Sequence, residues 1–181
     1  IAEQPTVIGE ALAHYIKGGE IVLPTQLDFA RLDRIVMVAC GTAFYACLTA
    51  KYWFEQIARL PVEADIASEF RYREPPIPAR SMALFVSQSG ETADTLAALR
   101  YTEGKADRIV SVVNVLESSI ARGSDLPLPI LAGAEIGVAS TKAFTCQLTV
   151  LFLLAIKAGL DRGTLTEAEA EAHLATLRNL P

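Results

Sequence analysis

The sequence has little of what would build a metal centre, a disulfide framework or a nucleic-acid-binding surface. It contains three cysteines and two histidines in 181 residues, and the spacing of Cys40, Cys47 and Cys146 matches no metal-binding motif. An odd number of unclustered cysteines is typical of reduced thiols in a cytoplasmic protein. The formal charge of −5 provides no basic excess for a phosphodiester backbone, so we expect no nucleic-acid partner.

The sequence also lacks a long hydrophobic run. The longest, residues 148–156, is nine residues long and includes Thr149. It is much shorter than the roughly 20 residues that span a bilayer, so we expect no membrane partner. Hydrophobic residues nevertheless make up 51% of the chain and charged residues 20%, which is typical of one folded domain. Because the sequence begins with Ile1 rather than Met, its natural start is expected upstream.

Five short apolar runs alternate with helical patterns. The runs, which predict strands, cover residues 34–39, 62–67, 82–86, 109–113 and 126–131. The helical patterns cover 5–17, 43–59, 92–102 and 141–158, with short helical stretches capped by Ser68 or lying near Ser118, and a terminal helix after the capping box Thr166–Glu169. This order predicts a five-stranded parallel sheet in a three-layer α/β/α sandwich with a flavodoxin-like arrangement. Pro127 and Pro129 suit an edge strand.

Residues 87–92, Ser-Gln-Ser-Gly-Glu-Thr, form the most informative loop. They lie between a strand and a helix, where ligands of open α/β sheets bind. The hydroxyls of Ser87, Ser89 and Thr92 are donors for phosphate oxygens, and the helix that follows offers free N–H groups. Gly90 lets the backbone approach an anion closely. Hydroxyl residues before a helix also act as simple caps, but three around one glycine exceed what one cap requires, so the loop predicts a phosphate site.

Two further polar segments are expected at the same edge of the sheet. The triplet Cys40–Thr42 follows the first strand, and residues 137–141 precede the last long helix. The carboxyl ends of parallel strands share one edge, so both segments are expected near the phosphate loop. Thr42 either caps its helix or contacts a ligand, and Ser140 and Thr141 are open to the same two interpretations.

Several charged residues have two interpretations. Glu135 is either a general base or an exposed loop carboxylate, and Lys142 either faces a ligand or solvates the start of its helix. The apolar helix 141–158 is either deeply buried or packed against another domain or subunit. One polar cluster is either a solvated face or a contact between subunits: Asp65, Glu69, Arg71 and Arg73.

Four segments together resemble a known family. They are Cys40–Thr42, 66–73, 87–95 and 135–142, and they are similar to the first sugar isomerase (SIS) half of the glutamine–fructose-6-phosphate aminotransferase (isomerizing) family. The resemblance extends over nearly the whole chain. It implies an SIS domain at 34–160, a helical lead-in at 1–33, and a C-terminal helix at 161–181 that leads to a second SIS half.

The resemblance also implies the ligand and the residues that hold it. The ligand is fructose 6-phosphate or glucosamine 6-phosphate, in amino-sugar synthesis from fructose 6-phosphate and glutamine. The expected phosphate-binding residues are Ser87, Gln88, Ser89 and Thr92, and the expected sugar-binding residues are Thr42, Val138 and Ser140. The family uses no metal or organic cofactor. Ala43 departs from its pattern, which usually has a serine there, and one possible hydroxyl contact is thereby removed.

The resemblance places the catalytic residues outside this sequence. In the family a Schiff-base lysine, a proton-transferring glutamate and a ring-opening histidine lie in the second SIS half, and ammonia comes from an N-terminal glutaminase domain. We therefore expect no catalytic residue in this chain, which would bind the ligand without turning it over, and we expect a homodimer.

Two alternatives are a sugar-phosphate sensor in a regulator and a stand-alone sugar isomerase or deaminase. The first predicts a basic helix-turn-helix segment upstream, and residues 1–33 contain none. The second needs its own acid and base, for which only Glu135 and Lys142 are candidates.

Overall fold

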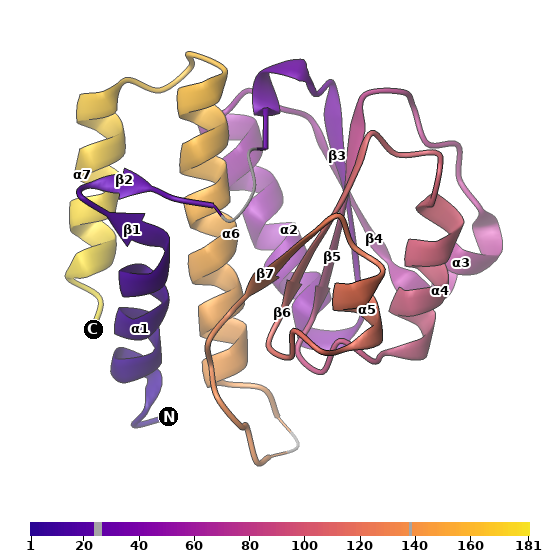
Figure 1. Cartoon of the computed structure of the whole chain (residues 1–181), viewed down its shortest axis with the longest axis horizontal. Helices are drawn as coiled ribbons and strands as arrows, with labels where there is room; N and C mark the ends of the chain where they lie inside the picture. The colour runs from indigo at the N-terminus through magenta and orange to yellow at the C-terminus, as the bar shows by residue number, and fades with distance from the viewer. Residues whose placement is uncertain (24–26, 138) are drawn as a thin grey trace.

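A parallel sheet of five strands forms the centre of the molecule in the computed structural model, which describes residues 1–23, 27–137 and 139–181 (Figure 1). The strands lie in the order β4-β3-β5-β6-β7, and every neighbouring pair is parallel. Their bounds are β3 Arg34–Ala39, β4 Val62–Ile66, β5 Ser81–Ser87, β6 Arg108–Val113 and β7 Leu126–Pro129. Numbered along the chain, this is the order 2-1-3-4-5 of flavodoxin-like folds. The predicted fold class is confirmed, and Pro127 and Pro129 lie on an edge strand.

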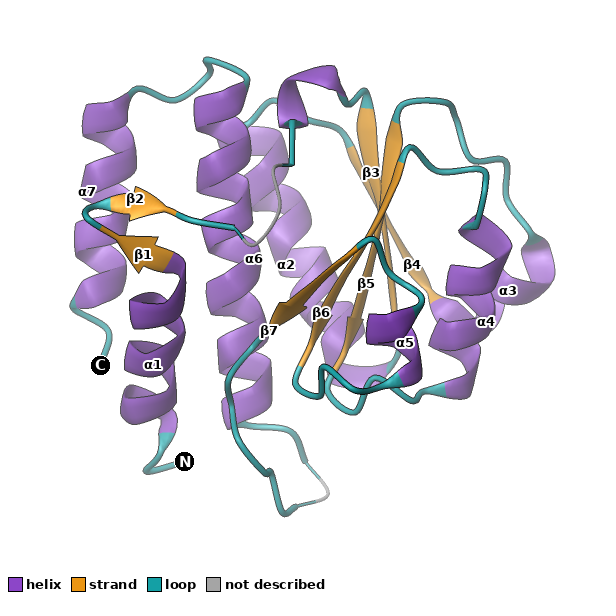
Figure 2. Cartoon of the chain, in the orientation of Figure 1, coloured by secondary structure: helices purple, strands orange, loops and turns teal. Residues whose placement is uncertain are grey.

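Helices cover both faces of this sheet (Figure 2). On one face lie α2 (Gly41–Ile57) and α6 (Lys142–Asp161), and on the other lie α3 (Ala67–Arg73), α4 (Ala93–Thr102) and α5 (Ser119–Arg122). Every residue of the central strand β5 is buried as a result. A strand covered on both faces needs continuous apolar residues rather than an alternating pattern, as the sequence of β5 shows.

An outer layer lies beyond α6, and although its two helices were predicted, their position outside the three-layer sandwich was not. It consists of α1 (Gln4–Tyr15), α7 (Glu167–Arg178) and the small hairpin of β1 (Ile16–Lys17) and β2 (Glu20–Ile21), and a short 3₁₀ helix η1 (Phe29–Arg31) leads into β3. The predicted helix 5–17 ends earlier because Ile16 and Lys17 pair with β2. Gly18 and Gly19 form the turn, and both have positive φ, which suits a tight hairpin.

Helix α6 lies between this outer layer and α2. With 20 residues, and a mean hydropathy of 1.8 over 18 of them, this helix is long and apolar enough to cross a membrane. However, 67% of that 18-residue stretch is buried inside the protein. Gly159 lets α2 approach closely, because a Cβ there would lie 2.9 Å from Ile57 Cγ2. The first interpretation of this helix, deep burial, therefore describes it in this fold.

The helix starts were predicted with mixed success. The capping box of α7 is confirmed, since Glu169 N donates to Thr166 Oγ1 and Thr166 N donates to Glu169 Oε2. The cap at Ser68 was wrong, because α3 begins at Ala67, one residue earlier, and Ile66 occupies the N-cap position. The strand β4 runs directly into α3 and leaves no linking residue for a polar cap.

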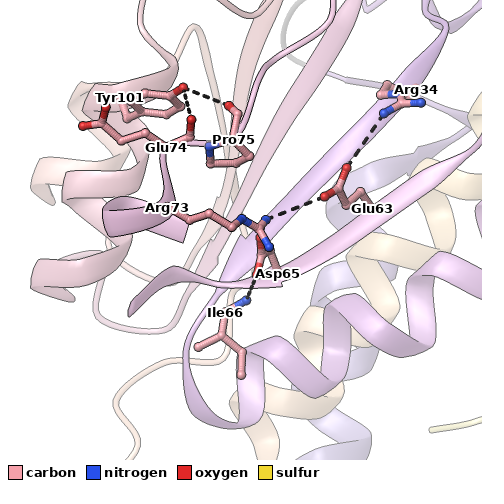
Figure 3. Close-up of polar contacts among 8 residues, drawn as sticks. All are labelled: Arg34, Glu63, Asp65, Ile66, Arg73, Glu74, Pro75 and Tyr101. Atoms are coloured by element: carbon pink, nitrogen blue, oxygen red, sulfur yellow. Dashed lines mark hydrogen bonds and ion pairs between the residues drawn. The ribbon is translucent and has the colours of Figure 1, made fainter. Parts of the chain in front are cut away.

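The two arginines of the polar cluster around α3 form ion pairs with different neighbouring elements, Arg73 with β4 and Arg71 with α4. Arg73 pairs with Asp65 and with Glu63, and Arg34 pairs with Glu63 at 3.8 Å, which forms a chain of charges along β4 and β3 (Figure 3). Arg71 instead pairs with Asp94 in the first turn of α4 at 2.7 Å. These pairs are mostly exposed, and exposed pairs add little stability.

Candidate functional site

A cavity of about 480 Å³ opens where β3 and β5 end. These strands are neighbours, but the helices that follow them lie on opposite faces of the sheet, so this is the point at which the strand order reverses. The expected convergence of three polar segments is what the structure shows. The cavity is lined by Cys40, Gly41, Thr42, Ala43, Val86, Ser87, Gln88, Ser89, Thr92, Glu135, Gly137, Ala139, Ser140 and Gln147.

The hydroxyl groups of the loop after β5 accept hydrogen bonds from their own main chain. Gly90 N donates to Ser87 Oγ at 3.1 Å, and Glu91 N donates to Ser89 Oγ at 3.2 Å. Ser87 Oγ also lies 3.2 Å from Thr92 Oγ1. A hydroxyl whose oxygen already accepts still has its own proton to donate, and phosphate oxygens require donors.

Gly90 is needed in this loop for two reasons. Its φ is +67°, a conformation that other residues adopt at a cost. A Cβ at this position would also lie 2.0 Å from Ser118 Oγ, at the start of α5. The close approach is supported by two further bonds, from Ile120 N to Gly90 O at 3.0 Å and from Ser119 N to Glu91 Oε1 at 2.7 Å. The loop is therefore clamped to α5.

Helix α4 begins at the same loop and points its first turn toward it. Thr92 occupies the N-cap position, and within the described ranges its side chain makes no capping hydrogen bond. The first N–H groups of a helix have no partner inside the helix, and they carry its partial positive charge. Among the described residues that line the cavity, none is a lysine or an arginine. An anion here would be held by neutral donors and the dipole of α4.

Asn114, which directly follows β6, joins the loops after three neighbouring strands. Its N–H donates to Gln88 O at 3.2 Å, while its side chain donates to Gly133 O at 2.7 Å and accepts from Ala132 N at 3.0 Å. Sequence reasoning missed this residue. The available signal was a single asparagine directly after a buried strand, where polar side chains of α/β sheets gather.

Glu135 anchors the segment before α6. Its carboxylate accepts from Ser140 Oγ at 3.0 Å, from Thr141 N at 2.9 Å and from Ala143 N at 3.3 Å. Partial burial alone would raise the pKa of Glu135, but the hydrogen bonds from these N–H and O–H groups outweigh it and hold the pKa below the ordinary value. The carboxylate is half-buried rather than exposed, and it acts as the cap of α6 from six residues upstream of Thr141.

The two candidates for acid–base chemistry, Glu135 and Lys142, are both engaged in hydrogen bonds within the protein. A base with a lowered pKa and several donors is a poor proton acceptor at neutral pH, which does not suit Glu135 as a general base. Lys142 is buried and donates from Nζ to Glu3 Oε2 at 2.6 Å, so it neither lines the cavity nor solvates its helix. Both interpretations of Lys142 were wrong, because the N-terminal segment that covers it was not recognised as a partner.

The predicted site residues within the described ranges all line this one cavity. Thr42 lies there, exposed in the first turn of α2, and of its two open interpretations the helix cap is wrong, because Cys40 occupies the N-cap position. Ser140 also lies there, whereas Val138 lies outside the described residues. Gln147 was missed. It is buried in the cavity wall, and its Oε1 has no hydrogen-bond partner in the part of the chain that the structure describes.

Comparison with known proteins shows relatives over the whole chain. The chain is 56% identical to a glutamine–fructose-6-phosphate aminotransferase (isomerizing) of Rhizobium leguminosarum bv. viciae and 54% identical to one of Mesorhizobium japonicum. Each match covers 100% of this chain and 30% of the relative, so the chain spans about a third of the length of these curated proteins.

The fold matches solved structures of the same kind. The C-terminal domain of glucosamine-fructose-6-phosphate aminotransferase from Francisella tularensis superimposes with a TM-score of 0.95 at 38% identity, over 98% of this chain and 52% of that one. The family model of the SIS domain matches residues 28–157, which include the sheet, α2 and most of α6. The chain therefore belongs to the SIS domain family.

Proposed function

We propose that this chain is the sugar-phosphate-binding half of an isomerase domain, in an enzyme that makes glucosamine 6-phosphate from fructose 6-phosphate and glutamine. The ligand would be fructose 6-phosphate or glucosamine 6-phosphate. The observation that carries the proposal is the set of neutral donors at the end of β5, in a cavity large enough for a hexose phosphate. The names of the curated relatives support the same activity.

Each part of the ligand has a proposed place. The phosphate would be held by the hydroxyls and main chain of the loop after β5 and the first turn of α4, with Ser87, Gln88, Ser89 and Thr92 as the contacting residues. The sugar would contact Thr42, Val138 and Ser140. Because Ala43 lines the cavity beside Thr42 without a hydroxyl, fewer contacts reach the ligand from α2.

The proposed complete protein contains more than this chain. Residues 34–160 would form the SIS domain, residues 1–33 its lead-in, and α7 in residues 161–181 would lead to a second SIS half that supplies the catalytic lysine, glutamate and histidine. A glutaminase domain would supply ammonia, and the assembly would be a cytoplasmic homodimer. The engagement of Glu135 and Lys142 in structural contacts supports a chain that binds without catalysing, and it disfavours a stand-alone isomerase or deaminase.

The binding proposal is tested by thermal unfolding with fructose 6-phosphate. At a hundredfold excess over the dissociation constant, a ligand stabilises the folded state by about 2.7 kcal/mol, which corresponds to roughly 5–10 °C for a chain of this size. Ser89→Ala removes one donor and should weaken binding about tenfold or more, while the melting temperature without ligand changes little.

Ser68→Ala in α3, away from the cavity, is the matched control and should respond to the ligand like the wild type. Equal stabilisation of the wild type and Ser89→Ala would remove this loop from the phosphate site. Formation of glucosamine 6-phosphate by the chain alone would contradict its assignment as a half without catalytic residues.

A further inference from the structure

Four groups donate hydrogen bonds to the carboxylate of Glu135. Ser140 Oγ lies 3.0 Å from Oε2, while Thr141 N, Thr141 Oγ1 and Ala143 N lie 2.9, 3.2 and 3.3 Å from Oε1. All four donors come from the start of α6 and the residues before it. Thr141 occupies the N-cap position without capping the helix by its own side chain, within the residues described, so Glu135 takes over this role.

The direction of these hydrogen bonds is fixed by chemistry. An ionised carboxylate has no proton and can only accept, so the hydroxyl protons of Ser140 and Thr141 must point toward Glu135. The lowered pKa of Glu135 keeps it ionised at neutral pH. Ser140 lines the cavity, and its oxygen therefore has only lone pairs left for a ligand.

At the proposed phosphate end of the cavity, the hydroxyl groups are oriented in the opposite way: their oxygens accept hydrogen bonds from the protein. Ser89 Oγ accepts a hydrogen bond from a main-chain N–H group, which leaves its proton available. Ser87 Oγ also accepts from a main-chain N–H group, and because the Ser87 and Thr92 hydroxyls bond to each other, this pair keeps one of its two protons for a ligand. One cavity thus combines hydroxyls that donate, after β5, with a hydroxyl that accepts, before α6. A phosphate dianion is an acceptor and suits the first group, whereas a sugar hydroxyl can donate and suits the second.

We propose that Glu135 is a positioning residue that orients the hydroxyl of Ser140. Because Ser140 donates its hydrogen bond to Glu135, its oxygen accepts one from a ligand hydroxyl, and the cavity selects sugars able to donate there. This inference rests on the proposed function, since it needs a sugar phosphate in the cavity. It assigns to Glu135 an indirect role in specificity, which acts through Ser140 rather than by proton transfer.

The test compares fructose 6-phosphate with analogues in which fluorine replaces the hydroxyl at C1, C3 or C4. Fluorine is similar in size but has no proton to donate. For wild type, one of the three analogues should bind about tenfold more weakly, which is the loss of one hydrogen bond of ordinary strength. Ser140→Ala should remove this discrimination, because the accepting oxygen is gone.

Glu135→Gln should reduce the same discrimination. Its carboxamide can donate to Ser140, whose hydroxyl is then free to donate to fluorine or to a hydroxyl alike. A residue that merely caps α6 would lower the melting temperature and weaken all the ligands by one factor, with the hydroxyl-to-fluorine ratio unchanged. An unchanged ratio in Glu135→Gln, or in Ser140→Ala if the first variant does not fold, would overturn the inference.

Inorganic phosphate separates this inference from the proposed function. Phosphate should bind equally to wild type, Glu135→Gln and Ser140→Ala, because its donors lie in the other loop. Glu69→Gln, an equal change of charge on the exposed side of α3, should leave every ratio as in wild type. If wild type binds fructose 6-phosphate but discriminates against none of the analogues, the inference alone fails. If wild type binds neither fructose 6-phosphate nor phosphate, the proposed function fails and the inference falls with it.

Discussion

Two of the three segments that line the cavity are held in place in different ways. Loop 87–92 is fixed by hydrogen bonds from its main-chain N–H groups to its own serine hydroxyls, by main-chain bonds from Asn114 and Ile120, and by the tight contact of Gly90 with Ser118. Before α6, the side chain of Asn114 holds Gly133, and the side chain of Glu135 holds Ser140 and Thr141. At Gly90 the first loop depends on the absence of a side chain, whereas the second depends on the presence of two. Substitutions should affect the two loops by different mechanisms.

The largest effect is expected for Gly90→Ala. The new Cβ would have to displace Ser118, and the alanine would have to keep the positive φ of Gly90. Together these two costs should lower the free energy of unfolding by about 3 kcal/mol. Phosphate binding should be lost with the loop geometry. Denaturant unfolding and ligand titration measure the two effects.

Gly104→Ala is the matched control, because its φ is +70° and a Cβ there would meet nothing within 4 Å. This substitution should lower the free energy of unfolding by about 1 kcal/mol, which is the cost of the positive φ alone. Equal costs for the two substitutions would show that the contact with Ser118 does not constrain the loop.

A smaller effect is expected for Asn114→Ala. It removes the hydrogen bonds to Ala132 N and Gly133 O, which should cost about 2 kcal/mol in the free energy of unfolding. The main-chain bond from Asn114 N to Gln88 O remains, so phosphate should still bind while fructose 6-phosphate binds more weakly. Asn179→Ala, at the exposed end of α7, is the control and should change neither. A parallel loss of both ligands would mean that the two loops are not independent.

The smallest effect is a dependence on pH that arises from Glu135. Its pKa in the folded state lies below the ordinary value of 4.5, so its contribution to stability is complete above pH 4.5 and is lost as the pH falls through the folded-state pKa. The difference in unfolding free energy between wild type and Glu135→Gln should be constant from about pH 6 to pH 8 and should narrow below about pH 4.5. A difference that instead narrowed as the pH rose would show that Glu135 is protonated in the folded state. Urea unfolding over a pH series measures it.

The same contrast explains what could be predicted from the sequence. Loop 87–92 was recognised because its hydroxyls and glycine are adjacent in the chain, and the strand order followed from five apolar runs between helices. The roles of Asn114 and Lys142 were missed, because their partners lie 18 and 139 residues away. The hairpin after α1 was missed for a related reason, since two strands of two residues are too short to give a pattern.

The role of Glu135 was misjudged for a different reason. Its partners are only five to eight residues away, but two of the four donors are main-chain N–H groups, which every residue type except proline has and which the sequence therefore does not reveal. A carboxylate in a loop is usually exposed, and only the fold shows that this one caps a helix. Local chemistry thus predicted a phosphate loop, whereas the hydrogen bonds that Glu135 makes to Ser140 and Thr141 required the tertiary structure.

The most direct test of the account is a crystal structure of the chain soaked in fructose 6-phosphate. We predict that the phosphate lies within hydrogen-bond distance of the hydroxyls of Ser87, Ser89 and Thr92 and at the first turn of α4, with the sugar extending toward Ser140. A phosphate bound elsewhere, for example in the groove between β2, α6 and α7, with the loop after β5 empty, would contradict it.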